Sequence, residues 1–375
     1  MKTRAAVLAR MEQPAPYAES KPLAIEELDL DGPGPGEVLV QVEAAGLCHS
    51  DLSVINGSRP RVMPMVLGHE AAGVVRETGP GVAGLKSGDR VVFSYVPICG
   101  HCAPCAAGRA SLCEEGMKAN VAGTLLSGAR RFRHAKHPTL NHHLGVSGFS
   151  EFTVAAQESL VKTDADLPSQ KAALFGCAVM TGVGAIVNTA KVEAGASVAV
   201  FGMGGVGLSA VMGAKLAGAQ PIIAVDLLDD KLALAAKLGA THTVNARKSN
   251  PVEAIRDLTR GGAQYVIECS GHEAVGQQAF EATRRGGETV YVGLPHPAKR
   301  LALSPVTIVG EERTVRGSYM GSAVPSRDIP RYIALYRAGR LPVDALVSRT
   351  ITFEELNAAF DTLDRGEAVR QILTF

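Results

Sequence analysis

The chain has 375 residues and a formal net charge of +1, from 38 lysines and arginines against 37 aspartates and glutamates. This length predicts about two domains, and the balanced charge argues against a nucleic-acid-binding surface. Seven cysteines and the lack of a secretory signal pattern at Met1 favour reduced thiols in the cytoplasm over disulfides. We therefore expect a cytoplasmic protein whose partner is a small molecule.

The first third of the chain predicts antiparallel β-structure. Its β-branched runs are Glu37 to Gly46, Glu70 to Gly79 and Asp89 to Val96, with turn sequences between them. The stretch from Glu114 to Gly148 has no such pattern, so we expect an irregular surface excursion. Its histidines are expected to be solvated: His134, His137, His142 and His143.

From Ser197 onward short apolar strands alternate with helical segments. The strands are SVAVFG, PIIAVD, YVIECSG and ETVYVGL, and the helices are Val206 to Ala219, Asp229 to Leu238 and His272 to Arg285. This alternation predicts an α/β fold with a doubly wound parallel sheet of the Rossmann type.

Two apolar segments need separate interpretation. Residues Ala194 to Ala214 are long enough to span a bilayer, but they are rich in glycine and divide into a strand pattern and a helix pattern, so we expect no membrane partner. The closing residues VRQILTF predict a strand that pairs back onto the first domain.

A glycine-rich loop follows the strand SVAVFG and precedes a helix. Its residues are Gly202, Met203, Gly204, Gly205, Val206 and Gly207. In a G-x-G-x-x-G loop the glycines allow a tight turn, approach of a pyrophosphate, and close packing of helix on strand. The strand PIIAVD ends at Asp226, where a carboxylate would bind the ribose hydroxyls and repel a 2′-phosphate, which favours NAD over NADP. Lys231 could reach the same ribose.

Four cysteines lie in the short segment CGHCAPCAAGRASLC. They are Cys99, Cys102, Cys105 and Cys113. Four thiolates in one loop can enclose zinc tetrahedrally, and a closed site of this kind is structural. The spacing alone also permits a redox pair or an iron–sulfur cluster.

Several motifs together resemble the zinc-dependent medium-chain alcohol dehydrogenase family, in its form with a structural-zinc loop. They are the cysteine loop, GMGGVG, GLCHSDLSVINGS from Gly46 to Ser58, GHEAAGVV from Gly68 to Val75, and CAVMTGVGA from Cys177 to Ala185. The resemblance implies a split, β-rich GroES-like catalytic domain over residues 1–178 and 319–375. It places the NAD-binding Rossmann domain at residues 179–318.

The resemblance also implies a second, catalytic zinc, and hence two zinc ions per chain. Cys48, His69 and Cys177 match its three ligands, with the fourth position left for water or substrate. Asp51 matches the carboxylate that orients His69, and Glu70 matches an acid close to the metal.

The implied reaction is reversible hydride transfer from a primary alcohol to NAD, which gives an aldehyde. Ser50 matches the hydroxyl of the proton relay, although Ser53 stands where some relatives carry a histidine that completes it. His49 and Arg370 match groups at the pyrophosphate, and Val292 is expected at the cofactor. Tyr95 matches an aromatic wall of the substrate channel, which favours an apolar or aryl alcohol.

One alternative within the family is a glutathione-dependent formaldehyde dehydrogenase. Such relatives carry an arginine four residues after the last structural cysteine, where it receives a carboxylate of the glutathione adduct. This chain has Met117 there, with Lys118 beside it. The excursion after Cys113 resembles that of dimeric relatives, so we expect a homodimer.

Overall fold

The computed structural model describes residues 1–375, which divide into two compact units. The first comprises Met1–Cys177, Val324–Pro330 and Asp344–Phe375; the second comprises Ala178–Ala323 and Arg331–Val343. Residues 319–323 and 331–343, which the sequence analysis assigned to the catalytic domain, group with the second unit.

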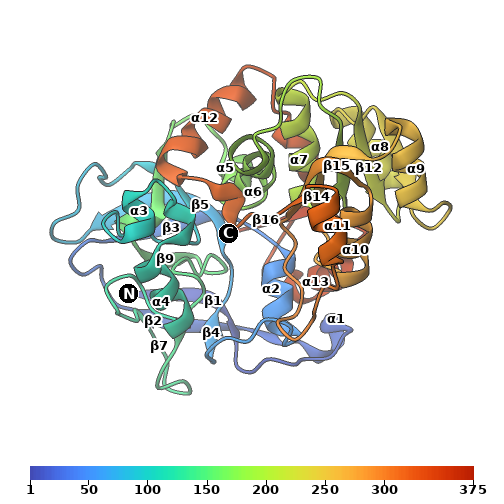
Figure 1. The fold of residues 1–375 in the computed structure, drawn as a ribbon. Coiled ribbons are helices and arrows are strands. Elements are labelled where there is room, and N and C mark those ends of the chain that lie inside the picture. The colour runs from blue at the N-terminus through green and yellow to red at the C-terminus, as the bar shows by residue number, and fades with distance from the viewer. The chain divides into compact units, whose positions relative to one another are not determined.

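The first unit contains two sheets (Figure 1). One has the order β7-β2-β1-β4-β8, with strands β1 (Lys2–Leu8), β2 (Leu23–Leu30), β4 (Met65–Val66), β7 (Phe132–Arg133) and β8 (Asn141–His142). The other has the order β10-β6-β5-β3-β18-β17, with β9 also paired to β3. Its strands are β3 (Glu37–Gly46), β5 (Glu70–Thr78), β6 (Arg90–Phe93), β9 (Phe152–Ala156), β10 (Leu160–Thr163), β17 (Val347–Ile351) and β18 (Arg370–Thr374).

Short helices connect these strands. They are α1 (Tyr17–Ser20), α2 (His49–Ile55), α3 (Ala103–Ala106), α4 (Glu114–Ala122), α5 (Ser169–Phe175) and α13 (Leu356–Asp364). The three strands expected in the first third are present as β3, β5 and β6. The closing strand is also confirmed, because β18 pairs antiparallel with β3 through Ile372 and Gly46.

The second unit contains one parallel sheet of order β13-β12-β11-β14-β15-β16. Its strands are β11 (Val198–Phe201), β12 (Ile222–Asp226), β13 (His242–Asn245), β14 (Ala263–Glu268), β15 (Thr283–Tyr291) and β16 (Thr314–Gly317). The helices are α6 (Ala178–Gly184), α7 (Gly205–Leu216), α8 (Asp229–Leu238), α9 (Pro251–Thr259), α10 (Glu273–Glu281) and α11 (Pro305–Gly310). The remaining helix, α12 (Pro325–Arg337), begins in the first unit and ends in the second.

Helices cover both faces of this sheet. Phe201 and Val225 point to one face, where they share a buried cluster with Val252 and Ile255 of α9. Helices α7 and α8 contact β11 and β12 without joining that cluster. The doubly wound α/β sheet expected from the alternating pattern is therefore confirmed, and the apolar segment Ala194 to Ala214 does split into strand β11 and helix α7.

Three expectations were wrong in detail. Helix α10 ends at Glu281 rather than at Arg285, because Thr283 already pairs with Ala263 as the start of β15. The excursion from Glu114 to Gly148 is not irregular throughout, since it contains α4, β7 and β8. His142 and His143 within it are buried rather than solvated.

One helical stretch, Ser169–Ala190, has the length and apolar composition of a membrane span. However, 89% of its most apolar window is buried inside the protein, as in a core helix.

Candidate active site

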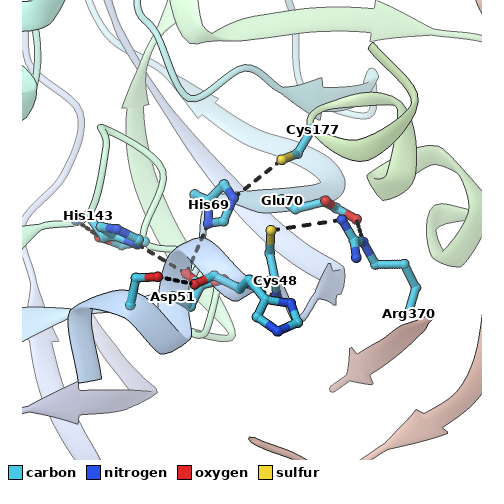
Figure 2. Close-up of polar contacts among 10 residues, drawn as sticks. Cys48, Asp51, His69, Glu70, His143, Cys177 and Arg370 are labelled. Carbon is cyan, nitrogen blue, oxygen red and sulfur yellow. Dashed lines mark hydrogen bonds and ion pairs between the residues drawn. The ribbon is translucent and has the colours of Figure 1, made fainter. Parts of the chain in front are cut away.

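Three potential metal ligands converge inside the first unit. Cys48 precedes α2, His69 precedes β5, and Cys177 follows α5, and all three side chains are almost fully buried. Their ligand atoms lie within 4.8 Å of one another, and Cys177 Sγ is 3.4 Å from His69 Nε2 (Figure 2). Tetrahedral zinc with nitrogen and sulfur ligands requires separations of about 3.3 to 3.8 Å. The donor set and its spacing therefore fit zinc.

Asp51 fixes the orientation of His69. One carboxylate oxygen, Oδ1, lies 3.0 Å from His69 Nδ1, and the other, Oδ2, accepts the backbone N–H of Cys48 at 3.3 Å. Burial alone would raise the pKa of Asp51, but the charge and hydrogen bond of His69, with His143, hold it well below the usual value. Asp51 is therefore an anion that leaves His69 Nε2 facing the two cysteines.

His143 is a neighbour of this group that the sequence analysis assigned to solvent. Its Nδ1 lies 3.2 Å from Asp51 Oδ1 (Figure 2). This contact falls short of the geometry of a good hydrogen bond. Burial lowers the pKa of His143, against the opposing effect of Asp51. Nothing in the local sequence signals this contact, because residue 143 reaches Asp51 only through the packing of the excursion on α2.

Glu70 and Arg370 form a buried ion pair beside Cys48. Arg370 Nε is 3.3 Å from Glu70 Oε1, and Arg370 Nη2 is 3.8 Å from Cys48 Sγ (Figure 2). Burial raises the pKa of Glu70 to about 7, in spite of the adjacent guanidinium. The pKa of Cys48 is lowered well below its usual value by the Cys177 thiol and by Arg370. The guanidinium of Arg370, which the resemblance to the family places at a pyrophosphate, therefore lies beside the Cys48 sulfur and the Glu70 carboxylate.

The remaining predicted residues around the metal group lie on α2 and at the end of β6. Ser50 is partly buried in the first turn of α2, and His49 is exposed. Tyr95 is buried, with its ring 5.6 Å from that of His69 and perpendicular to it. Ser53 donates to the carbonyl of His49 at 2.7 Å, so its hydroxyl supports the helix backbone.

The four cysteines of the loop form a second group in the first unit. The sulfurs of Cys99, Cys102, Cys105 and Cys113 lie within 4.8 Å of one another. Backbone N–H groups of Cys99 and Gly116 donate to Cys113 Sγ at 3.3 and 3.4 Å, and that of Cys102 donates to Cys99 Sγ at 3.4 Å. Backbone hydrogen bonds, first from Glu114, lower the pKa of Cys102 to about 6. This closed set of thiols fits a structural zinc.

The glycine-rich loop of the second unit joins β11 to the N-terminus of α7. Gly202 has a φ of 88°, and a Cβ on Gly207 would collide with the Gly202 carbonyl. A Cβ on Gly204 would meet nothing within 4 Å, so this side of the turn is open. Gly205 and Val206 begin α7, whose free N–H groups suit a pyrophosphate.

Asp226 supports this loop from the end of β12. Its Oδ2 accepts the Met203 N–H at 2.6 Å, and its Oδ1 accepts the N–H groups of Leu227 and Leu228 at 2.8 and 3.0 Å. Lys231 is partly exposed on α8, and Val292 is buried at the end of β15. These residues gather at the carboxyl edge of the parallel strands, where doubly wound sheets bind dinucleotides.

Glu268, at the end of β14, was not predicted. It is 2% exposed, and its Oε1 accepts the N–H groups of Ser270 and Gly271 at 2.6 and 3.0 Å. Burial raises its pKa, against those hydrogen bonds. The signal in the sequence was an acidic residue directly after the apolar run Tyr265 to Ile267 of a buried strand.

Comparison with known proteins gives matches over both units. The alcohol dehydrogenase GroES-like domain matches residues 34–165, and the zinc-binding dehydrogenase family matches residues 205–338. S-(hydroxymethyl)glutathione dehydrogenase of Paracoccus denitrificans is 37% identical over an alignment of 384 residues, which covers 100% of this chain and 100% of that protein.

Two solved structures are similar over the whole chain. An alcohol dehydrogenase zinc-binding domain protein from Burkholderia ambifaria is 37% identical with a TM-score of 0.93, covering 100% of this chain and 99% of that one. Benzyl alcohol dehydrogenase from Acinetobacter calcoaceticus is 32% identical with a TM-score of 0.92, with the same coverage.

Proposed function

The chain belongs to the zinc-dependent medium-chain alcohol dehydrogenase family, and from this membership we propose that it oxidises primary alcohols with an apolar or aryl body to aldehydes. That it is an NAD-dependent zinc oxidoreductase follows from the family itself. The identity of the alcohol, the role of each residue and the number of zinc ions are the parts that we propose.

In this proposal Cys48, His69 and Cys177 hold the catalytic zinc. When bound, zinc acts as a Lewis acid on the alcohol and NAD accepts the hydride. Asp51 keeps the proton on His69 Nδ1, so that Nε2 is free to bind metal. Arg370 balances the charge of the Cys48 thiolate and of Glu70.

Proton release and cofactor binding fall to other residues of the chain. We assign to Ser50 the first step of proton release, in which its hydroxyl would accept the alcohol proton and pass its own proton on to the nicotinamide ribose. We assign no relay role to Ser53, because its hydroxyl donates to the His49 carbonyl. The turn at Gly202 to Gly207 and Asp226 would bind NAD, with His49, Lys231 and Val292 also at the cofactor. The four cysteines from Cys99 to Cys113 would hold the second, structural zinc.

The proposed substrate class rests on the lack of a charged side chain at position 117, which is Met117. This uncharged side chain is 45% exposed at the position where glutathione-dependent relatives carry arginine. The adjacent Lys118 pairs with Glu115 at 2.7 Å. Without the planar guanidinium fork, a carboxylate of a glutathione adduct would lose its bidentate partner. The apolar wall of Tyr95 and the similarity to benzyl alcohol dehydrogenase support an aryl alcohol.

S-(hydroxymethyl)glutathione is the second candidate substrate. It is favoured by the full-length similarity to the Paracoccus enzyme of that name. Because the Lys118–Glu115 pair is exposed, it is weak and could open to receive a carboxylate.

A comparison of kcat/KM values separates the two candidates. NADH formation is followed with benzyl alcohol, medium-chain primary alcohols, and formaldehyde plus glutathione. We expect benzyl alcohol or a medium-chain alcohol to be the better substrate. A higher kcat/KM for the glutathione adduct would replace our proposal with the second candidate.

We further propose that the enzyme is a cytoplasmic homodimer. The cytoplasmic location rests on the seven cysteines, all of which are free rather than paired in disulfides. The dimer rests on the resemblance of the segment after Cys113 to that of dimeric relatives. Light scattering coupled to size-exclusion chromatography tests the dimer through the molar mass, for which each chain contributes 39.1 kDa.

A further inference from the structure

A third group of potential metal ligands lies away from both cysteine sites, where β7 meets β2. His134 directly follows β7, and His137 comes after the two-residue turn Ala135-Lys136. The two histidines form an antiparallel bridge, in which the His137 N–H donates to the His134 carbonyl at 3.0 Å. Facing residues of such a turn project to the same side, and the two ring centroids are 5.5 Å apart.

Glu26 of β2 completes this group. Side chains alternate along a strand, so Glu26 faces the same side as Leu28 and Leu30, which belong to a buried apolar cluster. Its side chain is only 14% exposed. Lys136 donates to one carboxylate oxygen, Oε1, at 3.5 Å, which leaves the buried oxygen Oε2 in need of a partner, because burial of an unpaired polar atom is costly.

The two histidines do not supply that partner through ordinary hydrogen bonds. Glu26 Oε2 is 3.6 Å from His134 Nδ1 and 3.2 Å from His137 Nε2. Both Glu26 Oε2 and His134 Nδ1 are inaccessible to solvent, and neither makes a hydrogen bond. The separations nevertheless match the edge of about 3.3 Å between nitrogen and oxygen ligands of a tetrahedral zinc ion.

We propose that Glu26, His134 and His137 form a binding site for a third divalent transition-metal ion, of which Zn²⁺ is the representative. All three ligand atoms lie within 4.8 Å of one another. Two imidazoles and one carboxylate are a known ligand set for zinc, and they leave a fourth position for water. The ion satisfies the buried Glu26 Oε2 and His134 Nδ1 together, and it ties β2 to the turn after β7.

Lys136 makes the site weaker than the cysteine sites. Its Nζ lies 3.5 Å from Glu26 Oε1, the oxygen that does not face the histidines. A cation at this distance repels a metal ion, so removal of its charge should tighten metal binding. The neighbouring Asp29 interacts electrostatically with His134 and is paired with Lys2 at 2.9 Å.

Calorimetric titration of the purified holoenzyme with Zn²⁺ tests the proposal, after loosely bound metal has been removed with the cysteine-bound zinc retained. We expect one additional equivalent per chain and a rise in Tm on its binding. His137→Asn and His134→Asn should each weaken this binding by at least about tenfold. Lys136→Met should strengthen this binding, because it removes a positive charge near the site and leaves all three ligands in place.

The matched control is His242→Asn, because His242 is an exposed histidine of the second unit. It should leave the additional equivalent unchanged. Titration with Co²⁺ identifies the ligands, since nitrogen and oxygen give only weak visible bands whereas thiolates add intense charge-transfer absorption. Absence of a further equivalent, unchanged affinity in His137→Asn, or thiolate absorption from the added Co²⁺ would each overturn the proposal.

Discussion

The two groups of potential metal ligands that contain cysteine differ in what supports their side chains. In the loop from Cys99 to Cys113 the thiols accept hydrogen bonds from nearby backbone N–H groups, and three of the four cysteines are partly exposed. Cys48, His69 and Cys177 come from distant segments and are buried. Their support comes from the side chains of Asp51 and Arg370.

This difference suggests that one group contributes mainly to the stability of the fold and the other mainly to the reaction. Backbone hydrogen bonds hold a loop in place without help from other side chains. A closed metal site can therefore form in a loop at the surface. A buried site supported by charged side chains can set the protonation of its ligands, which a metal with an open position requires. Substitutions of single side chains should therefore act on activity at one site and on stability at the other.

The substitution Cys48→Ala should have the largest effect on catalysis. Loss of a thiolate from the three-ligand set should remove the catalytic zinc and several kcal/mol of transition-state stabilisation, or at least about 10³-fold in kcat. Elemental analysis should find one zinc fewer per chain, while the Tm changes little.

Cys269→Ala is the matched control for this substitution. Cys269 lies in the second unit, outside both cysteine groups. The variant should therefore retain the full zinc content. Normal turnover by Cys48→Ala would show that the group of Cys48, His69 and Cys177 is not the catalytic site.

Cys102→Ala should have the opposite profile. Loss of one thiolate from the closed set should release the structural zinc and lower the Tm, because metal binding and folding of such loops are coupled. The protein that remains folded should keep its kcat within about tenfold, since the buried ligands are supported by other side chains. Thermal unfolding and kcat per bound zinc measure the two effects. If kcat fell as far as in Cys48→Ala at full folding, the two sites would not have separate roles.

The same contrast explains how much could be predicted from sequence. The alternating strands and helices, the glycine-rich turn and the cysteine loop are local patterns, so they were visible in the sequence, although the spacing of the cysteines did not distinguish zinc from a redox pair or an iron–sulfur cluster. The group of Cys48, His69 and Cys177 spans distant segments, and only the resemblance to a family brought it together. His143 was missed because its burial results from tertiary packing of a segment that shows no periodic pattern.

The contacts of Arg370 also depend on a tertiary feature, the register of strand β18. The resemblance to the family implies a place at the cofactor for Arg370, which stays a prediction; the contacts of its guanidinium with Glu70 and Cys48 were not foreseen. Strand β18 carries it there by pairing with β3, which ends just before Cys48. The pairing of the closing strand was predictable, whereas the register that decides which side chains meet was not.

Asp51→Asn should lower kcat/KM by about 10- to 100-fold, as is usual for carboxylates behind a metal-binding histidine. In the native protein both carboxylate oxygens accept, one from His69 and one from the Cys48 N–H. An amide offers only one acceptor, so it must present its NH₂ group to one of these two donors. Asp257→Asn, on the exposed side of α9, is the control. Metal content and kcat/KM within threefold of the wild type would contradict the positioning role of Asp51.

The smallest effect is expected for His143, the second donor near Asp51. Because its pKa is lowered by burial, His143 is neutral at pH 7, and its contact at 3.2 Å is poorly aligned. A neutral hydrogen bond contributes about 1 kcal/mol, or about fivefold in rate, and a misaligned one contributes less. His143→Ala should therefore lower kcat/KM by less than about fivefold, and His143→Gln, which retains an N–H donor, should recover part of the loss. Steady-state kinetics of both variants measure this difference. A loss as large as that of Asp51→Asn would mean that Asp51 depends on both histidines, and that the support of the buried site extends into the segment after the cysteine loop.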